Sequence, residues 1–257
     1  MAFYDNSKDE RVNIVNEIDR NIADDIAVGT HHFLLQYFAD EDTYIRKSGY
    51  LSIGRLYKSD PQLLPAILTT LTLLFKLPDA KVRQTVVNAA GEIGKYDFEA
   101  VKIYFDTGLF DEHHSVRNAV IGSMKKMGEK NPVPVIEWSR GYLHHEDKEI
   151  RREICHGIEL RGRTHPQDIL PLLRELQFDK TRRVRWTLVH VIGQIAYKKG
   201  CLETVMADIL QWENKELVQD AIEEIIDVHY RYRSFSFYTQ DEARVYVAGL
   251  GSIGPQA

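Results

Sequence analysis

Residues 179–196 read DKTRRVRWTLVHVIGQIA, and this stretch decides the fold. Four basic residues and Trp186 crowd its beginning, and apolar residues then recur at three- and four-residue spacing, which is typical of an amphipathic helix. An aliphatic residue directly before an arginine, Val184–Arg185, opens the apolar run. The same pair opens four earlier apolar runs, at Ile45–Arg46, Val82–Arg83, Val116–Arg117 and Ile150–Arg151.

The spacing of these pairs is nearly constant. Their arginines are 37, 34, 34 and 34 residues apart, and a further step of 34 leads to Val218–Gln219, where the apolar pattern continues without the charge. A fixed period of roughly 20 to 50 residues is typical of solenoids, in which small helical or stranded units stack along the chain. The opening stretch is therefore one copy of a repeat.

Each repeat contains two amphipathic segments, as DFEAVKIYFDTGLF (97–110) and SVRNAVIGSMKKMG (115–128) illustrate. The first helices begin at an N-cap followed by proline, as in Asp60–Pro61, Asn131–Pro132 and, with a poorer cap, His165–Pro166. Glycines fall eleven residues after three of the arginines, and we expect them to end the second helices in the left-handed conformation. They are Gly94, Gly128 and Gly162.

Over almost the whole chain this pattern resembles HEAT repeats, whose marks are an acidic residue in the turn between two helices and a V-R pair at the start of the second. The resemblance implies an all-α fold, an α-solenoid of about six HEAT-like helical-hairpin repeats. We expect a single domain, 1–257, with a lone N-terminal helix over 9–22, tandem repeats over 26–229 and an atypical C-terminal cap and tail over 230–257.

The resemblance also implies a structural ladder, in which the arginine bonds the acid of its own or the neighbouring turn. In this sequence the acid precedes the arginine by four to six residues. The expected members of the ladder are Arg46, Arg83, Arg117, Arg151 and Arg185 together with Asp42, Asp79, Asp111, Asp147 and Asp179.

The side chains one and five residues after each arginine share a helix face, because positions i and i+4 are neighbours on a helix. Along the chain this stripe is first polar, then basic and aromatic, then acidic at Asp220 and Glu224. Its middle part predicts a partner-binding patch, since exposed aromatic and arginine side chains favour contacts with other proteins. The alternative is that Trp186 fills the gap between repeats. The predicted patch comprises Arg152, His156, Arg183, Trp186 and His190.

Composition limits the function further. A content of 44% hydrophobic and 28% charged residues is typical of a folded protein. The sequence has no apolar run long enough for a membrane span, no secretory signature at its start and two cysteines, so we expect a cytoplasmic protein. The net charge is −5, but residues 139–200 carry 13 basic against 8 acidic residues and residues 1–45 carry 3 against 10. The basic region predicts a protein partner with an acidic segment.

Other motifs predict no chemistry. The letters GLGSIG (249–254) fit a dinucleotide fingerprint, but no helix follows to hold a pyrophosphate. Adjacent histidines, at His31–His32, His113–His114 and His144–His145, point apart on a helix and lack cysteine or carboxylate partners at zinc-site spacing. Cys155 is expected in the core. We therefore expect no catalytic residue, no metal and no cofactor.

The segment HYRYRSFSFYTQDEARVYVAG (229–249) departs from the repeat. We expect it to cover the apolar face that stacking leaves open on the last repeat. Its alternation of aromatic residues with arginine or serine leaves stacking on single-stranded nucleic acid as an alternative.

The function predicted from these observations is a non-catalytic scaffold or adaptor that binds a protein partner through the concave groove lined by second helices. The main alternative is a DNA-binding protein similar to bacterial alkylation-repair glycosylases, which are HEAT-like proteins that hold duplex DNA in a basic groove with tryptophans. Trp138, Trp186 and Trp212 are compatible with that resemblance, but no catalytic residue maps onto this chain. A weaker alternative is a bilin lyase-type HEAT subunit.

Overall fold

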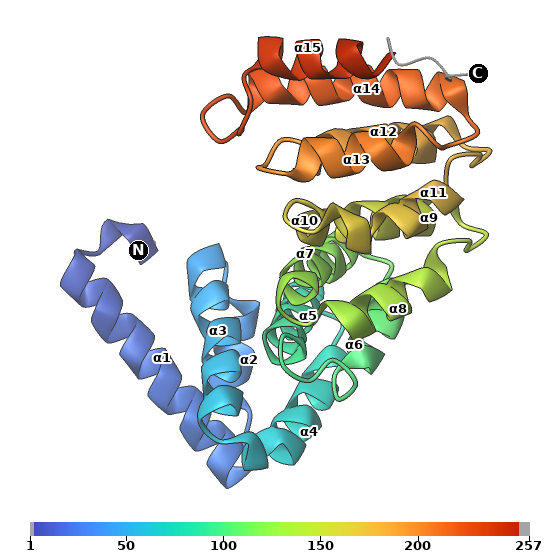
Figure 1. Ribbon diagram of the computed structural model, residues 1–257. Helices are drawn as coiled ribbons and strands as arrows, with labels where there is room; N and C mark the ends of the chain where they lie inside the picture. The colour runs from blue at the N-terminus through green and yellow to red at the C-terminus, as the bar shows by residue number, and fades with distance from the viewer. Residues whose placement is uncertain (1–2, 252–257) are drawn as a thin grey trace. The chain divides into compact units, whose positions relative to one another are not determined.

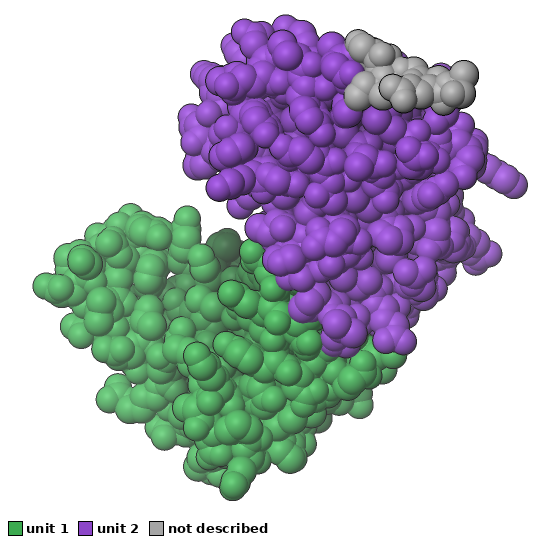
Figure 2. Space-filling view, in the orientation of Figure 1, with its two compact units in different colours: residues 1–131 green, residues 132–257 purple. Residues whose placement is uncertain are grey.

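The computed structural model describes residues 3–251, and every regular element within that range is a helix (Figure 1). The predicted all-α solenoid class is confirmed, because successive helical hairpins stack on one another in each part of the chain. The count of about six repeats stays a prediction. Two compact units are present, residues 1–131 and 132–257 (Figure 2). Within 3–251, no helix is both long and apolar enough to cross a membrane.

Unit 1 contains the longest helix, α1, which begins at a capping box between Ser7 and Glu10 and ends at Gly29 with φ of 78°. These two signals make α1 longer than the predicted span of 9–22. The second helices α3, α5 and α7 pack in succession. The elements of unit 1 are η1 (Phe3–Asp5), α1 (Lys8–Val28), α2 (His32–Ala39), α3 (Thr43–Ser59), η2 (Pro61–Leu63), α4 (Leu64–Phe75), α5 (Ala80–Gly94), α6 (Lys102–Gly108) and α7 (His114–Lys130).

Unit 2 repeats the arrangement, with α12 packed against α9 on one side and α14 on the other (Figure 1). The apolar residues that recur at helical spacing in α12 and at its C-cap are all fully buried: Val184, Leu188, Val191, Ile192 and Ile195. The elements of unit 2 are α8 (Pro132–Tyr142), α9 (Lys148–Gly157), α10 (Glu159–Gly162), η3 (Pro166–Asp168), α11 (Leu170–Glu175), α12 (Arg182–Gln194), α13 (Cys201–Ile209), α14 (Lys215–Arg231) and α15 (Gln240–Gly251).

The turn acids that precede their arginine by four residues are helix N-caps. Asp42, Asp79 and Asp147 each accept a hydrogen bond from a backbone amide in the first turn of α3, α5 and α9. His113 occupies the same place before α7, where its ring accepts from the amide of Ser115. These three aspartates therefore accept hydrogen bonds from backbone amides that have no acceptor within the first turn of the helix. The charge of each also attracts the arginine four residues later, so the ladder role predicted for them stays a prediction beside capping.

The turn acids that precede their arginine by six residues accept hydrogen bonds from the arginine that follows the preceding turn. Arg83 Nε lies 2.7 Å from Asp111 Oδ2, and Arg151 Nε lies 2.6 Å from Asp179 Oδ2. In both pairs Nη2 reaches the second carboxylate oxygen, so the contact is bidentate. The variation in offset thus separates two roles, capping a helix and joining successive turns.

All five arginines of the predicted ladder share a further contact. Each donates from Nη1 to the carbonyl oxygen six residues earlier, which fastens the second helix to its own turn. Arg46 and Arg185 hydrogen-bond these carbonyl oxygens and not the carboxylate of the aspartate predicted as partner. In the turn that follows Arg46, Leu77 stands where the later turns carry Asp111 or Asp179, so no carboxylate is offered there.

The predicted left-handed glycine C-caps are wrong. Within residues 3–251 only Gly29 and Gly200 have positive φ. Gly94, Gly128 and Gly162 do not, and two of them are required by close packing instead. A Cβ added to Gly94 would lie 2.3 Å from Met127 Sδ, and one added to Gly162 would lie 2.3 Å from Ile169 Cδ1. These glycines therefore let neighbouring elements approach closely.

The C-terminal segment continues the helical pattern. α14 extends to Arg231, and after a turn α15 packs on α14 and buries Ala243 completely. The turn is fixed by Phe237, whose amide donates to the Tyr197 carbonyl at 2.9 Å, and by Tyr232, whose ring stacks on that of Tyr197. Part of GLGSIG (249–254), and the tail predicted after it, lie outside the described residues.

The ion pair between Arg151 and Asp179 sets a first prediction. Their side chains are only 13% and 5% exposed. Burial by itself raises the pKa of Asp179, but hydrogen bonds from Arg151 and Thr181 and the charge of Arg151 outweigh it and hold the pKa below its ordinary value. We expect Asp179→Asn to lower the free energy of unfolding by about 3 kcal/mol, because a buried guanidinium loses its partner. Urea unfolding at pH 7 measures this.

The matched control for this substitution is Glu175→Gln, which breaks the Arg140–Glu175 pair, with side chains 54% and 33% exposed. Solvent screens such a pair, so we expect a change of less than about 1 kcal/mol. Equal losses in the two variants would contradict the structural role of Asp179.

A second prediction concerns the pH dependence of stability. His229 is fully buried in α14, where its Nδ1 lies 2.8 Å from the Ile225 carbonyl oxygen. Burial lowers its pKa below the ordinary value, and the bond to Ile225 only partly opposes this. As pH falls below about 6.5, the unfolded chain binds a proton that the folded chain excludes, so stability decreases by at most about 1.4 kcal/mol per pH unit.

We expect His229→Leu to remove this part of the slope between pH 7.5 and 5, measured by urea unfolding at several pH values. His144→Gln, a change at an exposed histidine, is expected to retain the slope of the unmodified protein. An unchanged slope in His229→Leu would show that His229 does not cause it.

Candidate partner-binding site

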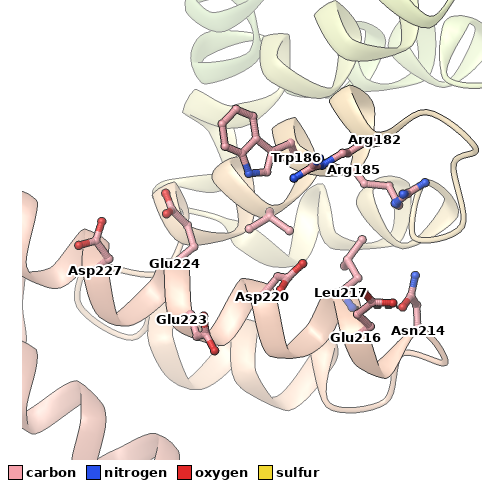
Figure 3. A pocket seen from close by; sticks show the side chains of 11 residues that line it. Arg182, Arg185, Trp186, Asn214, Glu216, Leu217, Asp220, Glu223, Glu224 and Asp227 are labelled. Carbon is pink, nitrogen blue, oxygen red and sulfur yellow. Dashed lines mark hydrogen bonds between the residues drawn. The ribbon is translucent and has the colours of Figure 1, made fainter.

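The surface formed by α12 and α14 contains a groove of about 630 Å³, which we call the acidic groove. Trp186, Arg182 and Arg185 project from α12, and carboxylates are spread along α14 on the other side (Figure 3). Five carboxylates therefore face two guanidinium groups. The carboxylates belong to Glu216, Asp220, Glu223, Glu224 and Asp227.

A second groove of about 400 Å³, the histidine groove, adjoins the first through Trp186, Val189 and Glu224, which line both. Four of the five residues predicted for the partner patch line it. They are Arg152, His156, Trp186 and His190. Their juxtaposition follows from the period, because positions 34 residues apart lie on neighbouring second helices. Their role in binding a partner stays a prediction.

Trp186 is the most exposed of the three tryptophans. Its exposed fraction is 75%, against 6% for Trp138 and 0% for Trp212. Trp212 donates from its indole nitrogen to Asp208 Oδ1 at 2.7 Å and belongs to the core. The alternative in which Trp186 fills a gap between repeats is therefore excluded by its exposure.

The histidines of the groove contact carboxylates. His156 Nε2 lies 3.1 Å from Glu159 Oε2, and His190 Nδ1 lies 3.4 Å from Glu224 Oε1. Arg231 also pairs with Glu224. Burial raises the pKa of Glu224, but the hydrogen bonds from His190 and Arg231 outweigh it and hold the pKa below its ordinary value, so Glu224 is an anion at neutral pH.

Arg183 is placed differently from the other four predicted residues. It does not line the histidine groove, and its Nη1 donates to Glu149 Oε1 at 3.0 Å. Its guanidinium is bound instead by the Glu149 carboxylate of the neighbouring helix α9. Arg183 supports the α9–α12 contact with an exposed ion pair.

Most arginines of the basic stretch 139–200 are compensated by carboxylates. Seven of its nine arginines form ion pairs with carboxylates. They are Arg140, Arg151, Arg152, Arg161, Arg163, Arg174 and Arg183. The acidic groove adds carboxylates from α14, beyond that stretch. An acidic partner segment, expected from local charge, is therefore disfavoured at this surface.

Both cysteines are poor nucleophiles. Cys155 and Cys201 are buried, and burial raises the pKa of each thiol. A thiol held protonated in the core is inert toward substrates. The prediction that Cys155 is a core residue is confirmed by its complete burial.

Sequence reasoning missed two residues of the histidine groove region. In sequence Arg231 stands in the C-terminal segment that departs from the repeat, yet it is the last residue of α14 and lines the groove. Glu159 was not singled out, although it follows His156 by three residues, the spacing that places two side chains on one helix face. That spacing was the available signal.

Comparison with known proteins gives a likeness in structure only. The sequence matches no family model and no curated protein. AlkD2 from Streptococcus mutans is similar with a TM-score of 0.54 and 16% sequence identity, over 78% of this chain and 97% of that chain. The complex of CpcE and CpcF of phycocyanin lyase from Nostoc sp. PCC7120 is matched with a TM-score of 0.33 and 14% identity, over 86% of this chain and 94% of that chain. The likeness to AlkD2 shows that this chain has a HEAT-like helical-repeat fold.

A third prediction follows from the different burial of the tryptophans. We expect Trp186→Ala to change the free energy of unfolding by less than about 0.5 kcal/mol, because its side chain already lies in solvent. Trp212→Ala should cost about 3–5 kcal/mol, as a large buried side chain leaves a cavity. Urea unfolding compares the two, and a large loss in Trp186→Ala would show that this tryptophan serves the core.

Proposed function

We propose that this protein is a non-catalytic scaffold, and that unit 2 binds a basic segment of a protein partner in the acidic groove. The observation that carries the proposal is Trp186, a large aromatic side chain 75% exposed at the junction of two grooves. Tryptophan is enriched among the residues that dominate protein interfaces, because burying it removes a large apolar area from water.

The charges around Trp186 specify the partner. The acidic groove presents five carboxylates, of which Glu224 is already paired with Arg231 and His190, and Asp227 with Arg231. Asp220 and Glu223 lie along the same helix, within the groove lining that includes the indole. A lysine or arginine side chain is attracted by carboxylates and also by the face of a tryptophan ring. A segment with alternating basic residues fits this combination better than an acidic one.

The same charges weigh against the DNA-binding alternative. A protein that follows a phosphate backbone neutralises several phosphates with lysine and arginine. In unit 2 most arginines of the basic region already have carboxylate partners, and the exposed tryptophan adjoins a row of acids. The likeness to AlkD2 concerns the fold, and a fold alone does not determine a ligand.

A fourth prediction tests this proposal with the full chain and fluorescently labelled probes. The probes are an array of lysine- and arginine-containing peptides, the same array with glutamate in place of the basic residues, and a DNA duplex. We expect only the basic peptides, and neither the glutamate peptides nor the duplex, to bind saturably. Fluorescence anisotropy at two salt concentrations measures this. Trp186→Ala, and Asp220→Asn with Glu223→Gln, should each weaken it about tenfold, equivalent to about 1.4 kcal/mol.

Phe235→Ala is the matched control, because Phe235 is a 74% exposed aromatic residue that lines neither groove. Its affinity should equal that of the unmodified protein. Binding of the duplex with a steep salt dependence would favour the DNA alternative. Failure of every basic peptide, or equal binding by Trp186→Ala, would overturn the proposed site.

A further inference from the structure

We propose that His156, Glu159 and His190 form a binding site for a divalent transition-metal ion, and that Zn²⁺ is the best chemical match. One ligand atom from each side chain lies within 4.8 Å of the other two. Two imidazoles and a carboxylate are ligands that zinc accepts in proteins. The proposal is independent of the basic segment proposed above, since it needs only these three side chains and their immediate supports.

Glu159 is held in the orientation that a metal ligand needs. It is only 1% exposed, and its Oε1 accepts hydrogen bonds from the Arg163 guanidinium, with Nε at 2.9 Å. Its Oε2 lies 3.1 Å from His156 Nε2. Two atoms bound to one tetrahedral zinc ion at about 2.0–2.1 Å lie roughly 3.3 Å apart. The carboxylate and the first imidazole therefore already have close to the separation of two ligands of a single ion.

His190 has the second contact typical of a metal-bound histidine. Its Nδ1 lies 3.4 Å from Glu224 Oε1, which leaves Nε2 as the ring nitrogen for an ion. A carboxylate on the other nitrogen fixes the tautomer and the ring orientation and makes the imidazole a stronger ligand. The rings of His156 and His190 are 6.2 Å apart between centroids. Because the χ2 torsion of histidine is broad, binding of an ion would turn both rings toward it at low cost.

The repeat creates this arrangement from distant residues. His156 and His190 are 34 residues apart and occupy equivalent positions on α9 and α12, which pack together. Glu159 follows His156 across the short break between α9 and α10. The sequence predicted no metal because its histidine pairs are adjacent and diverge, whereas these two histidines meet only through the stacking of repeats.

The surrounding charges and the exposure permit an ion to bind. The two guanidiniums that line the histidine groove are compensated, Arg152 by Glu149 and Glu153, and Arg231 by Glu224 and Asp227. The side chains of His156 and His190 are 37% and 42% exposed, so an ion reaches them from solvent. Three protein ligands leave a fourth position of a tetrahedral zinc ion for water.

The test is titration of Zn²⁺ into the full, untagged chain after treatment with a chelator, followed by calorimetry. We expect one equivalent to bind and His156→Gln and His190→Gln each to lower the affinity by at least about tenfold. The matched control is His144→Gln, since His144 is an exposed histidine of the same unit with a carboxylate partner, Glu175. Its affinity should be unchanged.

A second measurement separates metal binding from loss of folding. Co²⁺ in place of Zn²⁺ gives visible absorption bands that report a low-coordinate site with nitrogen and oxygen ligands, and circular dichroism verifies that each variant retains its helices. The bands should appear in the unmodified protein and in His144→Gln and be absent in folded His156→Gln. Zinc binding of equal affinity in all variants, or no saturable binding, overturns the site.

Discussion

The structure depends on the close approach of successive second helices. A helical hairpin of this length cannot bury its own apolar face, so the face is buried by the next hairpin. Small residues determine how near the helices come. A Cβ on Gly91 would lie 2.5 Å from Ser123 Oγ, and one on Gly193 would lie 2.6 Å from Glu224 Cγ. Because α12 and α14 touch at Gly193, the polar residues beside this contact are brought within reach of one another, which is how His190 meets Glu224.

The turns between helices contain arginines at equivalent sequence positions that make two kinds of contact, one within a turn and one between successive turns. The arginine of each V-R pair holds its own turn through a backbone carbonyl, and this contact is common to all five. Arg83 and Arg151 also join the next turn, through the residue six places before the next arginine. Asp111 and Asp179 supply a nearly buried carboxylate there, whereas Leu77 does not. Stacking therefore rests on apolar burial, and the bidentate pairs Arg83–Asp111 and Arg151–Asp179 are added to it between successive turns.

The sequence was sufficient for the fold class, for the core of the second helices and for the residues that share the stripe around Trp186. Each follows from helical periodicity and from a period of 34, which are local properties of the chain. The negative charge of the acidic groove was not predictable in this way. The groove combines residues of α12 with carboxylates of α14, and its charge depends on which arginines form ion pairs elsewhere. The roles of Gly94 and Gly162 also depend on contacts that are not local in sequence. Eleven residues after an arginine, a glycine is compatible with either a left-handed cap or a close contact, and only the neighbouring element distinguishes them.

The properties of the stripe change from repeat to repeat while its geometry does not. One residue after the arginine position, the chain carries Arg152, Trp186 and then Asp220, and four residues further it carries His156, His190 and then Glu224. Positions that face solvent are free to vary, since they contribute little to stacking. A single framework therefore places a guanidinium, an indole and a carboxylate in sequence along one surface, and beside them two imidazoles and a carboxylate. The chemistry of this face follows from three consecutive repeats acting together, because none of them carries the full set of side chains.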